Sequence, residues 1–134
     1  MALKKSPGGS IFPYYYKNGE LFGLHLGSFG SDGQGVIERM QAEQLFIAQQ
    51  GRNIPVWMDF YQTALTDEVV ACLIEMLVRI HHLVPKICFV GCSNRAKRKI
   101  KKLMAETASL AAVPARFFKD PEDAKTWLVS ENSL

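Results

Sequence analysis

The sequence predicts a single α/β domain in which a five-stranded mixed sheet carries helices on both faces. Two apolar runs, at residues 54–60 and 86–91, flank a helical pattern over residues 66–84. Strands that are joined by a helix pair in parallel, and such crossovers are almost always right-handed. Asn18 and Gly19 separate two further β-prone runs, which is typical of an antiparallel hairpin. The sheet should therefore contain both parallel and antiparallel strands.

Length and charge limit the class of protein. The chain has 134 residues, enough for one domain with a hydrophobic core. We expect this domain to span residues 1–134, with flexible ends at residues 1–10 and 130–134. The net charge of +3 is mild and does not indicate nucleic-acid binding. No stretch reaches the roughly 20 apolar residues of a membrane span, and the first residues lack the apolar run of a secretory signal. These features favour a cytoplasmic protein without a membrane span.

The three cysteines and the paired histidines do not indicate a chemical site. An odd number of cysteines without a CxxC pair favours reduced thiols. Cys72 lies mid-helix and Cys88 mid-strand, where we expect both to be buried packing residues. Cys92 follows a strand that opens into a helix, so its burial stays open. His81 and His82 are adjacent and point in different directions, which disfavours metal binding. We expect neither a metal nor a cofactor.

The first third of the chain predicts a hairpin, a glycine-rich turn and a helix. The hairpin strands are expected at residues 11–16 and 21–26, and alternation along the first strand exposes at least one of three consecutive tyrosine rings. Residues 27–35 are glycine-rich, but they lack the ending of a phosphate loop and the spacing of a dinucleotide fingerprint. The pattern predicts a turn into a helix over residues 36–50 that ends at Gly51.

The helix over residues 66–84 has the clearest signals. Thr66 caps backbone N–H groups, and Asp67 and Glu68 complement the positive end of the helix dipole. A wide apolar stripe follows at helical spacing. It comprises Val69, Leu73, Met76, Leu77, Ile80 and Val84, and is widened by Val70, Ile74 and Val78. So broad a surface indicates burial on more than the sheet side, either within the domain or beneath a partner.

Two charged features accompany the second half of the sheet. Asp59 ends a parallel strand at the edge where open α/β sheets place their sites. A carboxylate that anchors the following loop is the preferred interpretation. A helix capped by Ser93 or Asn94 carries a basic face. That face consists of Arg95, Lys97, Arg98, Lys99, Lys101 and Lys102. It is typical of a solvated surface, and attraction to an acidic protein or an anionic surface is the alternative.

The last strand, at residues 114–119, and a helix capped by Asp120 complete the order ββαβαβαβα. This order resembles the STAS-like fold of sulfate-transporter and anti-sigma-factor-antagonist domains, and of related small lipid-binding domains. The resemblance covers roughly residues 11–130. The matching pieces are the strand ending in Asp59, the helix start at Thr66, Asp67 and Glu68, the strand closing at residues 89–91 and the ending over residues 117–128.

The resemblance implies a regulatory role for the start of the second helix. Antagonist domains of this family carry a phosphorylatable serine or threonine there, typically after an aspartate. Asp67 matches the aspartate, and Glu68 stands where the hydroxyl residue would be. A glutamate provides a constant negative charge, with less charge and fewer acceptor oxygens than a phosphate. Thr66 is the nearest hydroxyl, and its capping role competes with modification.

These features favour a non-catalytic regulatory or scaffolding domain that binds a protein partner. The contact surface is expected at the carboxyl edge of the sheet and the start of the second helix. Its candidate residues are Asp59, Tyr61, Thr66, Asp67, Glu68, Gly91, Cys92 and Ser93. The alternative is a small-molecule or lipid-binding module at the same edge, for an apolar or anionic ligand, and a homodimer stays open. An enzyme is less favoured, because Cys92 with His81 or His82 is the one nucleophile pairing available, without a supporting motif.

Overall fold

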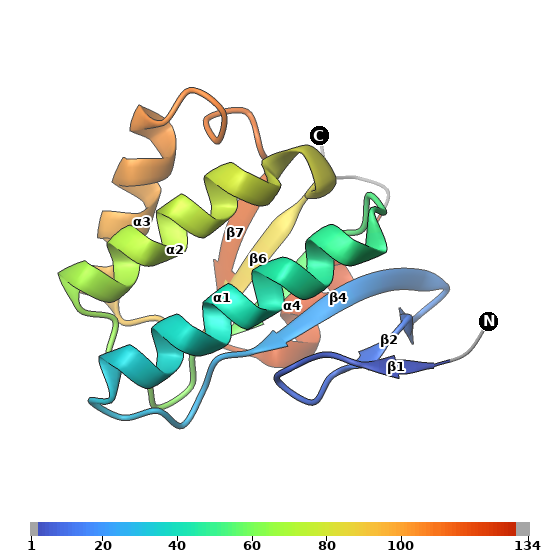
Figure 1. Cartoon of the computed structure of the whole chain (residues 1–134). Coiled ribbons are helices and arrows are strands. Elements are labelled where there is room, and N and C mark those ends of the chain that lie inside the picture. Colours follow the sequence, from blue (N-terminus) through green and yellow to red (C-terminus); the bar gives the residue numbers. More distant parts are fainter. Residues whose placement is uncertain (1–2, 131–134) are drawn as a thin grey trace.

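The computed structural model describes residues 3–130 and contains one main sheet and a two-stranded sheet. The strands are β1 (Lys4–Lys5), β2 (Ile11–Phe12), β3 (Tyr14–Tyr16), β4 (Gly19–His25), β5 (Val56–Asp59), β6 (Ile87–Val90) and β7 (Ala115–Phe118). The main sheet has the order β3-β4-β5-β6-β7. β3 runs antiparallel to β4, whereas the other neighbours are parallel. The predicted α/β class and five-stranded mixed sheet are confirmed (Figure 1).

Helices cover both faces of the main sheet. They are α1 (Gly33–Gln50), α2 (Asp67–Ile80), α3 (Asn94–Glu106) and α4 (Pro121–Leu128), with a short 3-10 helix η1 (His81–Leu83) after α2. The crossovers from β4 to β7 all step in the same direction, so right-handed connections place α1, α2 and α3 on one face. On that face α2 lies between α1 and α3 (Figure 1), and α4 packs on the opposite face.

Alternating side chains of the strands build one core on each face of the sheet. Val56 and Met58 of β5 face the three-helix side, whereas Trp57 packs with Leu128 of α4. All six residues of the predicted apolar stripe are buried, and Val78 is exposed. Because α1 and α3 flank α2, its broad apolar surface is covered mainly within the domain and does not by itself indicate a partner.

Residues 3–10 form a hairpin loop, although the sequence predicts a flexible segment there. β1 pairs with β2, and Ser6 and Ser10 are buried between them and the rest of the domain. The Ser6 N–H donates to the Ser10 carbonyl at 2.8 Å, which closes the hairpin. Burial of polar groups costs little free energy when the groups hydrogen-bond to one another. The predictions for residues 1–2 and 131–134 lie outside the described residues.

The expected first strand, at residues 11–16, is divided at Pro13. A proline has no N–H for a ladder, so the run separates into β2, which pairs with β1, and β3, which pairs with β4. Phe12 stacks on Phe22 of β4, with ring centroids 4.4 Å apart. Phe46 of α1 meets the Phe12 ring edge-on at 5.9 Å. This aromatic contact fastens the hairpin against α1 and the sheet.

The consecutive tyrosines of β3 alternate as predicted. The Tyr15 ring is 71% exposed, whereas Tyr14 and Tyr16 are half-buried beside α4. Lys125 donates to the Tyr14 hydroxyl at 3.2 Å, and the hydroxyls of Tyr16 and Thr126 lie 3.3 Å apart. Tyr15 pairs with Glu20 at the amino end of β4, so its exposed ring lies at the end of the sheet opposite the carboxyl edge loops of β5 and β6.

Side-chain caps determine where the helices begin. Thr66, Ser93 and Asp120 each accept a hydrogen bond from a backbone N–H in the first turn, so the predicted caps are confirmed. Asp32 caps α1 in the same way, and α1 therefore starts within the glycine-rich segment. Gly51 ends α1 with a left-handed φ of 60°, as predicted.

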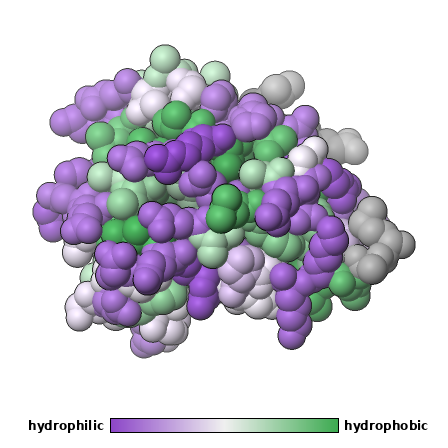
Figure 2. Space-filling model, viewed as in Figure 1, coloured by the Kyte–Doolittle hydropathy of each residue, from purple (hydrophilic) through white to green (hydrophobic). Residues whose placement is uncertain are grey.

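The surface over α1 and α2 is mixed in polarity. Figure 2 shows hydrophobic residues interspersed with hydrophilic ones on this face, without one broad apolar area. Leu45 and Val78 are exposed, and single exposed hydrophobic residues of this kind are ordinary. In the described part of the chain, no helix is both long and apolar enough to cross a membrane.

Candidate functional site

The loops at the carboxyl edge of the parallel strands are fixed to one another. They are residues 26–32 between β4 and α1, residues 60–66 between β5 and α2, and residues 91–93 between β6 and α3. The Ser28 N–H donates to the Tyr61 carbonyl at 2.6 Å, and the Gly30 N–H donates to the Gln62 carbonyl at 2.8 Å. In return, the Ala64 N–H donates to the Gly30 carbonyl at 2.8 Å. Backbone hydrogen bonds therefore hold the first two loops together.

Gly91 allows the third loop to touch the second. Its φ of +82° is a left-handed conformation that favours glycine. A Cβ at this position would lie 2.8 Å from the Tyr61 nitrogen and 3.1 Å from the Phe60 carbonyl carbon. Both atoms belong to the backbone and have little freedom to retreat. Gly91 therefore contributes to the edge by permitting close contact between the loops.

Replacing Gly91 with alanine should lower the free energy of unfolding by about 2 kcal/mol, because backbone strain and a steric clash add. Urea denaturation would measure the loss. Gly9 provides the matched control, since it has a φ of +92° but open space around its Cβ position. Its alanine variant should lose only about 1 kcal/mol. Equal losses in the two variants would show that the contact between the loops contributes nothing.

Asp59 anchors the loop that presents Tyr61. Its carboxylate accepts the Tyr61 N–H at 2.9 Å, which confirms the anchoring interpretation. The Thr63 hydroxyl donates to the Leu26 carbonyl at 2.8 Å and ties the same loop to the end of β4. The Tyr61 side chain is nevertheless 59% exposed. An aromatic ring therefore projects into solvent from a backbone that is held in place.

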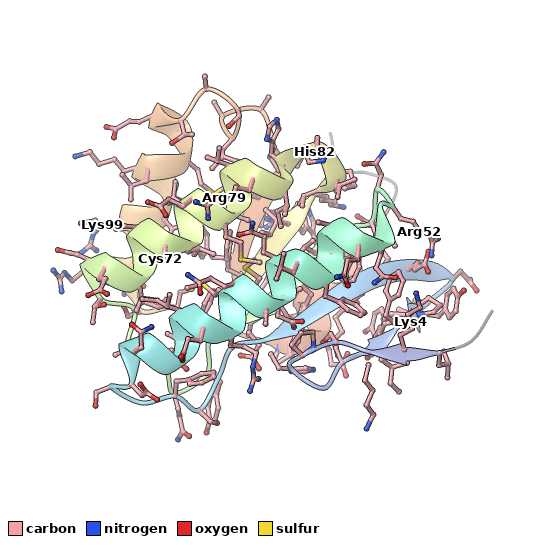
Figure 3. All side chains as sticks on the ribbon, in the orientation of Figure 1. Lys4, Arg52, Cys72, Arg79, His82 and Lys99 are labelled. Carbon is pink, nitrogen blue, oxygen red and sulfur yellow. The ribbon has the colours of Figure 1, made fainter. Side chains whose placement is uncertain are left out.

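The acidic start of α2 is paired with α3. The Asp67 carboxylate lies 3.0 Å from the Lys99 ammonium group and 3.8 Å from the Arg95 guanidinium group. The hydrogen bond and the charge of Lys99 lower the pKa of Asp67 from its ordinary value. Figure 3 shows Lys99 on the side of α3 near the beginning of α2. Asp67 is therefore not a free negative charge, whereas Thr66 and Glu68 are exposed at the helix start.

The cysteines are packing residues rather than activated nucleophiles. Cys88 is fully buried as predicted, but Cys72 is only half-buried, because it lies at the flank of α2 and not beneath it. Cys92 is also half-buried. Burial raises the pKa of the Cys88 and Cys92 thiols to about 12, and the Asp59 carboxylate adds to the effect at Cys92. Thiols with such pKa values are almost entirely protonated at neutral pH.

The pairing of Cys92 with a histidine is not assembled. His81 and His82 precede the amino end of β6, whereas Cys92 follows its carboxyl end. The whole length of the strand therefore separates the thiol from both imidazole rings. Among residues 3–130, no three His, Cys, Asp or Glu side chains are arranged to hold a metal ion.

Sequence reasoning missed a hollow beside Cys92. It encloses about 210 Å³ and is lined by Cys92, Asn94, Lys97, Phe117, Phe118 and Lys119. This volume is below the roughly 300–1,000 Å³ of typical small-molecule sites. Its walls come from α3 and β7, which are distant in the sequence. No local sequence signal marks this hollow, because it forms only where α3 packs beside β7.

The carboxyl edge brings Tyr61, Thr66, Glu68 and Ser93 to one exposed end of the sheet, while Asp59 and Gly91 support the loops beneath them. Such a surface can offer aromatic contact, hydrogen bonds and charge, and no activated nucleophile is part of it. Comparisons with known protein families, with curated proteins and with solved structures found no match.

Proposed function

We propose that the chain is a non-catalytic regulatory or scaffolding domain whose carboxyl edge and second-helix start bind a protein partner. The observation that carries the proposal is the Tyr61 ring, which is 59% exposed on a loop whose backbone is hydrogen-bonded from both sides. Exposed aromatic side chains dominate the energetics of many protein interfaces. A loop that is already fixed also loses little conformational entropy on binding.

The resemblance to STAS-like domains supports a regulatory role. From β3 to α4 the elements follow the order ββαβαβαβα. In antagonist domains of that family, the start of the second helix carries the phosphorylated residue. In this proposal Glu68 corresponds to that position and supplies a carboxylate in place of a phosphate, while the neighbouring Asp67 pairs with Lys99. Binding at this surface is therefore constitutive in our proposal and does not require phosphorylation.

A protein partner is preferred over a small ligand for a geometric reason. The hollow of about 210 Å³ beside Cys92 is small compared with most ligand sites. Tyr61 stands outside the residues that line it. An exposed aromatic ring that lies outside the hollow is better matched by another protein, whose own pocket can enclose the ring.

The proposal predicts that cross-linking depends on position. A photoreactive phenylalanine analogue in place of Tyr61 should capture a protein in native cells, whereas the same analogue in place of Tyr15 should not. Both side chains are exposed, at 59% and 71%, so the comparison separates binding from accessibility. Mass spectrometry would identify the captured protein, and the purified protein should form a saturable complex with the unmodified domain. Equal capture at both positions, or no saturable complex, would contradict the proposal.

A further inference from the structure

One edge of the main sheet is open at β7. Within residues 3–130, β7 pairs with β6 and with no other strand. The Ile87 N–H donates to the Pro114 carbonyl at 2.9 Å, so the backbone of Pro114 and of alternate residues after it faces β6. The backbone groups of Ala115 and Phe117 consequently point away from the sheet. Such a row of donors and acceptors is a template to which another strand can add.

Two hollows follow one another along α3 and β7. The first, of about 210 Å³, is lined by Lys97 and Lys119, and the second, of about 180 Å³, is lined by Lys101 and Ala115. Phe117 lines both hollows. We call the two hollows together the β7 groove. It runs beside the open edge, on the face of the sheet that α3 covers.

The floor of the β7 groove is apolar and well packed. The Phe117 ring stacks on Phe89 of β6, with centroids 4.7 Å apart and an interplanar angle of 19°. Met104 and Leu110, which line the second hollow, are buried. Alternate side chains of an added strand point to one face of the sheet. They can therefore enter the hollows without rearrangement of the floor.

The rim of the β7 groove is positively charged. Lys97, Lys101 and Lys119 line it, and no aspartate or glutamate of the described chain does. The ammonium groups of Lys97 and Lys101 lie 6.0 and 5.8 Å from the Phe117 ring centroid. Arg116 adds a cation on the opposite face of β7. Pairing of β7 with β7 of a second copy would bring these like charges together. Charge complementarity therefore favours an acidic strand over a second copy.

We propose that the β7 groove binds an extended acidic segment of a partner protein as an additional strand. The segment hydrogen-bonds to the outward backbone groups of Ala115 and Phe117. Its apolar side chains fill the two hollows, and its carboxylates lie beside Lys97 and Lys101. This inference goes beyond the Tyr61 surface and does not depend on it. The two surfaces adjoin at Cys92, which follows β6 and lines the first hollow. A domain with two contact surfaces would be suited to scaffolding.

A synthetic peptide tests the proposal on the full chain. The peptide has blocked ends and two isoleucines that are separated by one residue, so that both point to the same face of the sheet, with glutamates on both sides of them. Titration calorimetry should show saturable binding that weakens with added salt. The double variant Lys97→Glu, Lys101→Glu should bind about tenfold or more weakly. The double variant Arg98→Glu, Lys102→Glu is the matched control. It changes the charge of α3 equally at residues that do not line either hollow, and its affinity should change less than about threefold.

Backbone pairing is tested with N-methylated peptides. N-methylation of alternate residues removes the N–H donors along one edge of an added strand, so one of the two alternate patterns should abolish binding and the other should preserve it. Absence of binding, equal loss in the two charge variants or equal behaviour of the two methylation patterns would overturn the proposal. A wild-type dimer that excludes the peptide would assign the edge to a second copy. If Tyr61→Ala loses peptide binding and the double variant Lys97→Glu, Lys101→Glu keeps it, the peptide binds the Tyr61 surface. The groove proposal would then be wrong, while the proposed function would stand.

Discussion

Replacing Lys86 with alanine should lower the free energy of unfolding by about 3 kcal/mol. Lys86 precedes β6 and is only 4% exposed. Its ammonium group donates to the carbonyl of Trp127, in the last turn of α4, and to the carbonyl and hydroxyl of Ser130, just beyond the helix. It also lies 4.2 Å from the centroid of the Trp127 ring. The truncation leaves the carbonyl groups at this helix end without a charged donor and removes packed aliphatic atoms.

The variant Lys86→Met separates these contributions. Methionine keeps most of the aliphatic contact but cannot donate a hydrogen bond, so it should recover about 1 kcal/mol of the loss in alanine. Lys102→Ala serves as a control for loss of one positive charge, because Lys102 is exposed on α3. Urea denaturation of the three variants and the wild type would measure the differences. A Lys86→Met variant as stable as the wild type would show that the ammonium group does not stabilise the docking of α4.

The stability of the wild type should fall by about 2 to 3 kcal/mol as the pH rises from about 4.5 to about 7. The cause is Glu43 of α1, which is 1% exposed beneath the N-terminal hairpin. Burial raises the pKa of Glu43 from 4.5 to about 7, although hydrogen bonds from Ser6 and Gly8 and the charge of Arg39 oppose the rise. In this pH range the folded protein binds a proton that the unfolded chain releases. The contribution of Glu43 to stability is therefore fully present below about pH 4.5 and is lost as the pH rises to about 7.

The variant Glu43→Gln should remove this pH dependence. Glutamine retains an acceptor for the Ser6 hydroxyl, which lies 3.2 Å from the Glu43 carboxylate, and it carries no charge to desolvate. Above pH 7 the variant should therefore be more stable than the wild type by about 2 kcal/mol. Glu38→Gln is the matched control, because Glu38 is exposed on the same helix. Urea denaturation at several pH values would provide the comparison, and parallel stability curves for the wild type and Glu43→Gln would rule out this role of Glu43.

Local patterns were sufficient to predict β4 to β7 and the caps of α2, α3 and α4, whereas β1 and the Asp32 cap of α1 were missed. The run at residues 54–60 is apolar on consecutive positions because helices cover both faces of β5. Thr66 and Ser93 act within one helical turn, so their roles can be read without knowledge of the rest of the fold. The anchoring role of Asp59 also spans only two residues. Interactions between residues this close in the chain can be predicted directly from the sequence.

Contacts between distant segments could not be predicted in the same way. Asp67 and Glu68 are equivalent in the sequence, but α3 places Lys99 beside Asp67 and so neutralises one of them. Glu43 lies on the buried stripe of α1 with Met40 and Ile47, but the sequence does not show that Ser6 of the N-terminal hairpin hydrogen-bonds to its carboxylate there. Phe117 became part of a groove only through the packing of α3 beside β7. Each of these outcomes depends on which elements become neighbours.

The most direct test of the central claim uses the protein that cross-links at position 61. Its affinity is measured for two variants of the domain, Tyr61→Ala and Tyr15→Ala. Tyr61→Ala should weaken the complex about tenfold or more, as expected for an exposed aromatic ring at the centre of an interface. Tyr15→Ala removes a more exposed ring from β3 and should leave the affinity unchanged. Both variants should retain the wild-type free energy of unfolding within about 0.5 kcal/mol, so that the comparison reports binding alone. Equal affinities of the two variants for the partner would contradict the assignment of the carboxyl edge as the binding surface.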